Sequence, residues 1–209
     1  MSNQKTTKTI QATTCLEGVQ MFGYEGKVTL RLQNGHNKTI MSKQYHNTGM
    51  SSLFKFLCTA LAGEYTDALR PCKIRLFTYK KAVESDSKPS DFNWESEFNG
   101  ASATELPTAA SPFVLYDSTP TINKVGNSYT TTFHFRIPCS LISQDLVHMI
   151  GFFSNNVYTG LEKDASAYYL LTEKNNDGVL EWAPLDLTEV SGSYSLIIDW
   201  TMSVENKSN

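Results

Sequence analysis

The segment Ser128-Tyr-Thr-Thr-Thr-Phe-His-Phe-Arg-Ile-Pro138 decides the fold class of this chain. Its odd-numbered positions, from Tyr129 to Ile137, are mostly aromatic or aliphatic, whereas its even-numbered positions carry Thr, His and Arg. Such alternation is typical of a strand with one buried face and one hydrated face. Because antiparallel sheets can keep one face in water, the segment predicts an antiparallel, β-rich domain.

The same period of two recurs on both sides of this segment. Lys27–Gln33 alternates in the same way, and the Asn34-Gly35 pair after it predicts a hairpin to residues 37–43. Gly126-Asn127 predicts a second hairpin, which would pair residues 121–123 with the strand at 128–138. Further strands are expected at residues 72–79, 113–116, 148–154, 167–172 and 193–205.

Only residues 46–63 follow a helical period. Their apolar side chains recur at the spacing i, i+3, i+4, i+7, i+8 and i+11; they are Met50, Leu53, Phe54, Leu57, Cys58 and Leu61. Thr48 or Ser51 can cap the first turn, and Gly63 is placed to adopt the left-handed conformation that ends many helices. We expect an amphipathic helix at about residues 50–62, packed against Ile74 and Leu76.

These elements predict a mostly β chain, an antiparallel β-sandwich with a single helix that covers one side or end. A chain of 209 residues and 23.4 kDa has the size of one domain. Residues 1–14, rich in Thr, Lys and Gln, are expected to form a flexible arm, and residues 15–209 the domain. Residues 80–112 lose the alternation and are expected to form a long loop or an insertion.

Three aromatic residues, Phe92, Trp94 and Phe98, lie among acidic and amide residues of this expected loop. Large aromatic side chains in a polar loop either hold the loop to its own core or contact a binding partner. The sequence favours the first alternative. Under the second, the three residues form an interaction loop.

Composition and charge exclude several classes of protein. The net charge is −3, the pI is about 5.8, and Lys and Arg are scattered, so we expect no direct nucleic-acid partner. The polar N-terminus has no apolar leader, and no run approaches the ~18 apolar residues that span a bilayer. We therefore expect synthesis in the cytoplasm without a signal peptide or membrane segment. The four dispersed cysteines are expected to be buried free thiols.

No motif in the sequence predicts a catalytic residue, a cofactor or a metal. Glu173, Asn175 and Asp177 match the first ligand positions of a calcium loop, but Pro184 occupies the position of the closing carboxylate, which favours a plain turn. No nucleophile elbow or phosphate-binding glycine motif occurs. His46-Asn47 before the expected helix can bind an anion at the helix N-terminus, although a capping role for Asn47 is favoured.

One family resemblance remains, and it is carried by two segments. The first runs from His46-Asn-Thr-Gly49 through the apolar segment that ends in Ala62-Gly63 to Arg70-Pro-Cys-Lys-Ile-Arg-Leu76. The second is Leu196-Ile-Ile-Asp-Trp-Thr201, followed by a final Asn206. The chain resembles small head- or tail-associated structural proteins of tailed bacteriophages.

The resemblance implies a non-enzymatic virion protein, a capsid-associated, head-fibre or ring/tail component without a cofactor. Its partners would be further copies of itself and other virion proteins, and its location would be the virion. The alternative is a receptor- or glycan-binding β-sandwich module, because aromatic rings such as that of Trp94 stack on sugars and anchor interfaces.

Overall fold

The computed structural model describes residues 22–46, 48–49, 62–63, 71–83, 88–93, 103–105, 114–115, 120–142, 145–154 and 165–206. Strands dominate these residues, and their pairings are all antiparallel. The helices described are the short 3-10 helices η2 (Lys80–Val83), η3 (Pro89–Asp91) and η4 (Cys139–Leu141). The expected mostly β, antiparallel character is therefore confirmed.

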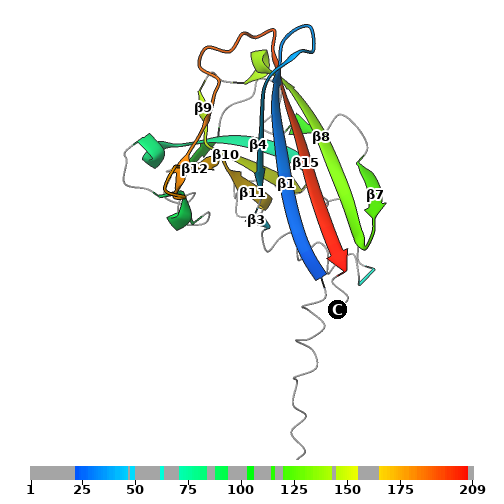
Figure 1. The fold of residues 1–209 in the computed structure, drawn as a ribbon. Coiled ribbons are helices and arrows are strands. Elements are labelled where there is room, and N and C mark those ends of the chain that lie inside the picture. Colours follow the sequence, from blue (N-terminus) through cyan, green and yellow to red (C-terminus); the bar gives the residue numbers. More distant parts are fainter. Residues whose placement is uncertain are drawn as a thin grey trace, which may run out of the picture.

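A five-stranded sheet of long strands forms one layer (Figure 1). Its order is β2 (Thr39–His46), β1 (Phe22–Gln33), β15 (Ser195–Asn206), β8 (Ser128–Pro138) and β7 (Thr121–Val125). The last described strand thus lies between the first described strand and β8. Hydrophobic residues of the three central strands share one face because Val28 is in register with Trp200, and Trp200 with Phe133.

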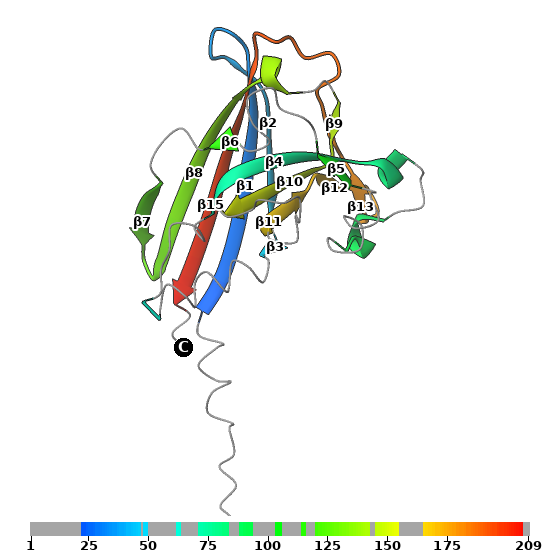
Figure 2. The same ribbon diagram turned by 180° about the vertical axis from the view of Figure 1, so that it is seen from behind.

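A second sheet packs on one face of the first, and its strands cross in front of the long strands in Figure 2. Its order is β3 (Thr48–Gly49), β11 (Ala165–Leu170), β10 (Met149–Ser154), β4 (Pro71–Tyr79) and β5 (Ala103–Glu105), and β6 (Val114–Leu115) also pairs with β4. Two small ribbons complete the described strands: β12 (Thr172–Lys174) with β13 (Leu180–Trp182), and β9 (Leu146–Val147) with β14 (Leu185–Asp186).

The main hydrophobic core lies between the facing sides of the two sheets. Phe152 of β10 lies 4.9 Å, between ring centroids, from both Phe133 of β8 and Trp200 of β15. Tyr169 of β11 is also 4.9 Å from Trp200, in an edge-on arrangement. These side chains are at most 6% exposed. Burial of an aromatic side chain contributes roughly 2–3 kcal/mol, so this layer supplies much of the stability.

A smaller cluster covers the opposite side of the second sheet. Phe77, Tyr79, Met149 and Phe153 are buried there, and Trp182 of the β12–β13 ribbon packs on them. The second sheet is thus covered on both faces, which explains why the residues from His148 to Phe153 form an almost unbroken apolar run.

The expected hairpins are present, with one difference in turn geometry. Gly126 has φ of 59° at the first central position of the β7–β8 turn, as type II′ turns require. In the β1–β2 turn the positive φ of 59° falls on Asn37 instead of Gly35. Asn34 explains the shift, because its side-chain oxygen accepts hydrogen bonds from the backbone N–H groups of His36 and Lys38 and so stabilises a longer loop.

Several expectations fall partly or wholly outside the described residues. These are the arm at residues 1–14 and residues 50–61 of the expected helix, which stay predictions. Gly63 does adopt the expected left-handed conformation, with φ of 76°. Thr48, one of the two capping candidates, lies in β3 and pairs with Tyr168. Among the described residues, no helix has the length and apolar character needed to cross a membrane.

The strand expected at residues 72–79 is confirmed as β4. The side chains of Ile74 and Leu76 belong to the core between the two sheets. Their expected contact with the helix involves residues outside the described part of the chain and stays a prediction. The expected long loop also contains described structure, because β5 pairs with β4 and two 3-10 helices follow β4.

Candidate interaction surfaces

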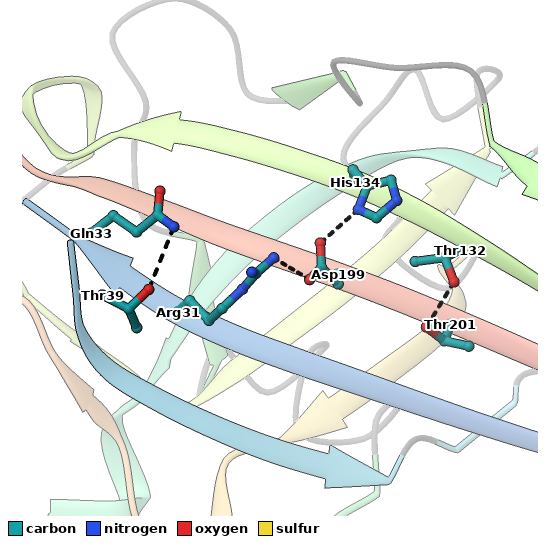
Figure 3. Close-up of polar contacts among 7 residues, drawn as sticks. All are labelled: Arg31, Gln33, Thr39, Thr132, His134, Asp199 and Thr201. Atoms are coloured by element: carbon teal, nitrogen blue, oxygen red, sulfur yellow. Dashed lines mark hydrogen bonds and ion pairs between the residues drawn. The ribbon is translucent and has the colours of Figure 1, made fainter. Parts of the chain in front are cut away.

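The outer face of the five-stranded sheet is polar, and its side chains bond to one another. Asp199 on β15, the central strand, accepts a hydrogen bond from Arg31 Nη2 on β1. Its second oxygen lies 2.7 Å from Nδ1 of His134 on β8, as Figure 3 shows. The Asp199 side chain is only 18% exposed, whereas Arg31 and His134 are 35% and 44% exposed. One carboxylate therefore contacts a polar side chain on each neighbouring strand.

Hydroxyl pairs continue this arrangement along the sheet. Thr132 and Thr201 lie 3.1 Å apart between their side-chain oxygens, and Thr130 and Ser203 lie 3.0 Å apart. Cross-strand pairs of this kind stabilise a sheet by roughly 0.2–1 kcal/mol each. The face is thus a hydrated surface whose polar groups are largely engaged with each other, and its residues come from strands more than 60 positions apart.

The inner face of the same sheet is covered along only part of its length. Residues of β8 and β15 near the β7–β8 turn have the same inward parity as Phe133 and Trp200, yet Tyr129 is 54% exposed and Val204 is 38% exposed. On β7, Ile122 is in register with Thr131 and is 71% exposed. The described strands of the second sheet lie behind the other part of the sheet (Figure 1).

Strand β7 forms one edge of the five-stranded sheet. All of its residues are exposed, and Val125 is 72% exposed. The strand pairs, among the described residues, with β8 alone. Because alternate residues of a strand direct their N–H and C=O groups to opposite sides, roughly half of the β7 backbone groups point away from β8. An edge of this kind can accept a further strand.

The structure describes one of the three aromatic residues of the expected interaction loop. Phe92 follows η3, is half-buried and packs on the cluster behind the second sheet, with its ring centroid 5.2 Å from that of Tyr79 and 6.1 Å from that of Trp182. Phe92 therefore holds the start of the loop to the core. Trp94 and Phe98 lie outside the described residues, and their role stays a prediction.

A buried histidine, His148, lies beside the same cluster and is 3% exposed. Its Nδ1 accepts a hydrogen bond of 3.2 Å from the backbone N–H of Tyr79, and its ring lies edge-on to Trp182 at 5.7 Å. Burial lowers the pKa of His148 from its ordinary value of 6.5, against smaller opposing effects of the Leu146 backbone and Asp145. A neutral ring suits this position, because Nδ1 needs its lone pair to accept the hydrogen bond from Tyr79.

Burial also shifts the pKa values of two other side chains. It raises the pKa of Tyr45 to about 12, with a further contribution from the charge of Glu173, so the phenol stays protonated in the folded chain. It raises the pKa of the Cys139 thiol. Cys139 and Cys72 are buried free thiols, as the sequence predicted, whereas Cys15 and Cys58 lie outside the described residues.

The calcium-loop lookalike forms the turn between β12 and β13. Asn175 Oδ1 accepts hydrogen bonds from the backbone N–H groups of Asp177 and Val179, and Gly178 has φ of 77°. Its amide nitrogen donates to Glu181, so Asn175 closes the turn. Glu173 forms an ion pair of 2.7 Å with Lys43 of β2. Within the described part of the chain, no three acidic, His or Cys side chains gather as metal ligands would.

The sequence also offered the pair His46-Asn47 as a candidate anion-binding site at the N-terminus of the expected helix. His46 ends β2 and is in register with Lys27, whereas Asn47 lies outside the described residues. The anion-binding role of the pair stays a prediction.

The Arg31–Asp199–His134 cluster was not predicted from the sequence. Each residue occupies a solvent-facing position of a strand that the sequence does predict. The alternation of apolar and polar residues therefore places all three on hydrated faces. The sequence does not show that β1 pairs with β15 and β15 with β8, because local patterns do not specify which distant strands pair. No protein-family model, curated protein or solved structure matches the chain.

Proposed function

We propose that this chain is a non-enzymatic structural protein of a bacteriophage virion and that it acts by assembly with itself and with other virion proteins. The finer fold that belongs to this proposal is a β-sandwich with one covering helix at about residues 50–62. Such a protein would be a capsid-associated, head-fibre or ring/tail component. The resemblance of residues 46–76 and 196–206 supplies the class of particle.

One structural observation supports assembly above the others, and it is the exposed β7 edge with the uncovered inner face beside it. Ile122 and Tyr129 are each more than half exposed and lie on the inner face of two paired strands. Clustered exposed apolar side chains on a soluble domain typically mark an interaction surface. A subunit that is repeated on a particle can use such a surface to bind its neighbours.

The outer face has a structural role in this proposal. Its polar side chains form pairs across strands, because Asp199 contacts both Arg31 and His134 and the neighbouring hydroxyls contact each other. This arrangement gives the sheet lateral cohesion. It also gives the subunit a hydrated outer surface.

Mass spectrometry of virions purified from a culture that carries the gene tests the proposed function. We expect peptides of this chain in the particle fraction, at a constant ratio to the major capsid protein through successive density gradients. A chain that stays in the lysate, and whose ratio to the capsid protein falls at each gradient, would contradict the proposal. A disruption of the gene that leaves particle structure and yield unchanged would contradict it as well.

A further inference from the structure

We propose that strand β7 pairs with β7 of a second copy of this chain, antiparallel and centred on Asn123, so that two five-stranded sheets become one continuous sheet. This inference rests on the proposed function only in assuming that the chain assembles with itself. It adds the surface, the partner and the register.

Among the described residues, no strand pairs with the free edge of β7, whereas the other edge of the sheet is protected. Strand β2 carries a register shift opposite Leu32 and Gln33, and its Lys43 is held by Glu173 of β12. Bulges and charged side chains are common devices against edge-to-edge pairing. Strand β7 pairs with β8 in unbroken register over its full length and has no bulge. Strand addition is therefore favoured at β7.

A charged side chain on β7, that of Lys124, could protect this edge against strand addition. The position of its ammonium group leaves the edge accessible. Its Nζ lies 5.6 Å from the centroid of the Tyr129 ring, on the neighbouring strand β8. A cation over a tyrosine ring is attracted to the face of that ring. The charge is thus directed back over its own sheet, away from the free side of β7.

The turn fixes which backbone groups point outward. Val125 and Ser128 flank the two-residue turn, and residues in these positions are joined by the turn's hydrogen bond. Alternation along β7 then directs the N–H and C=O groups of Asn123 toward β8 and those of Ile122 and Lys124 toward the free edge. Ile122 and Lys124 are therefore the residues that can bond to an added strand.

A second copy of β7 matches this pattern in one register. When Asn123 faces Asn123 of the second copy, all five residues of the strand overlap and Ile122 lies opposite Lys124 of the second copy, so the outward backbone groups pair. If each strand slides by one residue past the other in one direction, Lys124 of one copy faces Lys124 of the second copy. The opposite shift places Lys124 opposite Pro120, which has no N–H.

The side chains are compatible with the same register. On the inner face, Ile122 meets the aliphatic stem of Lys124 of the second copy, beside Tyr129. On the outer face, the two Asn123 amides meet at a position where the strands approach closely, and each amide can donate to and accept from the other. No like charges face each other. An interface of this size belongs to the weak class and would gain strength from many copies on a particle.

Charge exchange at Asn123 tests this register. The full-length wild-type chain, examined by sedimentation at low ionic strength, should approach twice 23.4 kDa with increasing concentration. Asn123→Asp and Asn123→Lys should each weaken dimerisation by about tenfold or more, because like charges would face each other across the two-fold axis. An equimolar mixture of the two variants should recover the dimer. Asn123 is exposed, so neither change should affect folding.

Asn176, an exposed residue of the β12–β13 turn, provides the matched control, and its substitution by Asp or Lys should leave dimerisation unchanged. Lys124→Pro removes an outward N–H without removing a bond to β8 and should also abolish the dimer. A wild-type chain that stays monomeric at the highest concentration would overturn the inference, as would Asn123 variants that dimerise like the wild type. A monomeric chain found in virions would refute the β7 pairing alone, whereas a β7 dimer absent from virions would refute the proposed function alone.

Discussion

At the two ends of the inner face of the five-stranded sheet, residues of the same strands point to the same side but lie in opposite environments. At one end Trp200 and Phe133 are covered by Phe152 of the second sheet and are at most 6% exposed. At the other end Tyr129 and Val204, on the same strands, are 54% and 38% exposed. Alternation thus assigns a residue to a face, whereas burial depends on whether a second layer reaches it.

The largest expected effect comes from the covered end. Trp200→Ala should destabilise the chain by about 3–5 kcal/mol, because it removes a ring that contacts both Phe152 and Tyr169. Tyr129→Ala at the uncovered end is the matched control and should change stability by no more than about 0.5 kcal/mol. Urea unfolding followed by tryptophan fluorescence or circular dichroism measures both. Equal losses for the two variants would contradict the difference between the ends.

Gly151 tests how tightly the second sheet is packed. A Cβ at this position would lie 2.4 Å from a ring carbon of Phe153 and 3.2 Å from Phe77, and both rings are fully buried. Gly151→Ala should therefore cost about 1–3 kcal/mol through overpacking. Gly35→Ala is the control, since its Cβ would meet only the Ser193 carbonyl oxygen at 3.6 Å. A Gly151→Ala protein as stable as Gly35→Ala would show that the rings can move aside.

His148 makes the cluster behind the second sheet sensitive to acid. Its folded-state pKa is lowered, so the unfolded chain binds a proton first as the pH falls below about 6.5. The contribution to stability is complete above that pH and declines below it, by up to about 1.4 kcal/mol per pH unit. His148→Asn should reduce this slope between about pH 6.5 and 5 in thermal unfolding. An unchanged slope would assign the acid sensitivity to other groups.

The smallest expected effect is on the outer face. Asp199→Asn should cost at most about 1 kcal/mol, because its contacts with Arg31 and His134 are partly exposed and screened by solvent. The cost should shrink further in high salt. Chemical denaturation at two salt concentrations measures it. A salt-independent loss of several kcal/mol would mean that the cluster is part of the core.

The sequence was sufficient for features that depend on local patterns. The alternation from Tyr129 to Ile137 predicted β8 and its buried face, and Gly126-Asn127 predicted the turn to β7. It was not sufficient for pairings between distant strands. Nothing local to Asp199 shows that β15 inserts between β1 and β8, so the contacts of Asp199 with Arg31 and His134 could not be anticipated.

Exposure was also beyond local patterns. Tyr129 has the same parity and aromatic character as Phe133, and only the extent of the second sheet separates an exposed residue from a buried one. In the loop after β4 the sequence left two roles open for Phe92, and its contacts with Tyr79 and Trp182 require long-range packing to be known. The helix at about residues 50–62 stays a prediction.

Hydrogen exchange measured as a function of protein concentration tests the central claim, that the covered end is core and the β7 end is an assembly surface. The amides of Ile122 and Lys124 should exchange rapidly in dilute samples and become protected as concentration rises. The amide of Trp200 should be protected throughout. Exchange at Ile122 and Lys124 that does not depend on concentration, whether fast or slow, would contradict the claim.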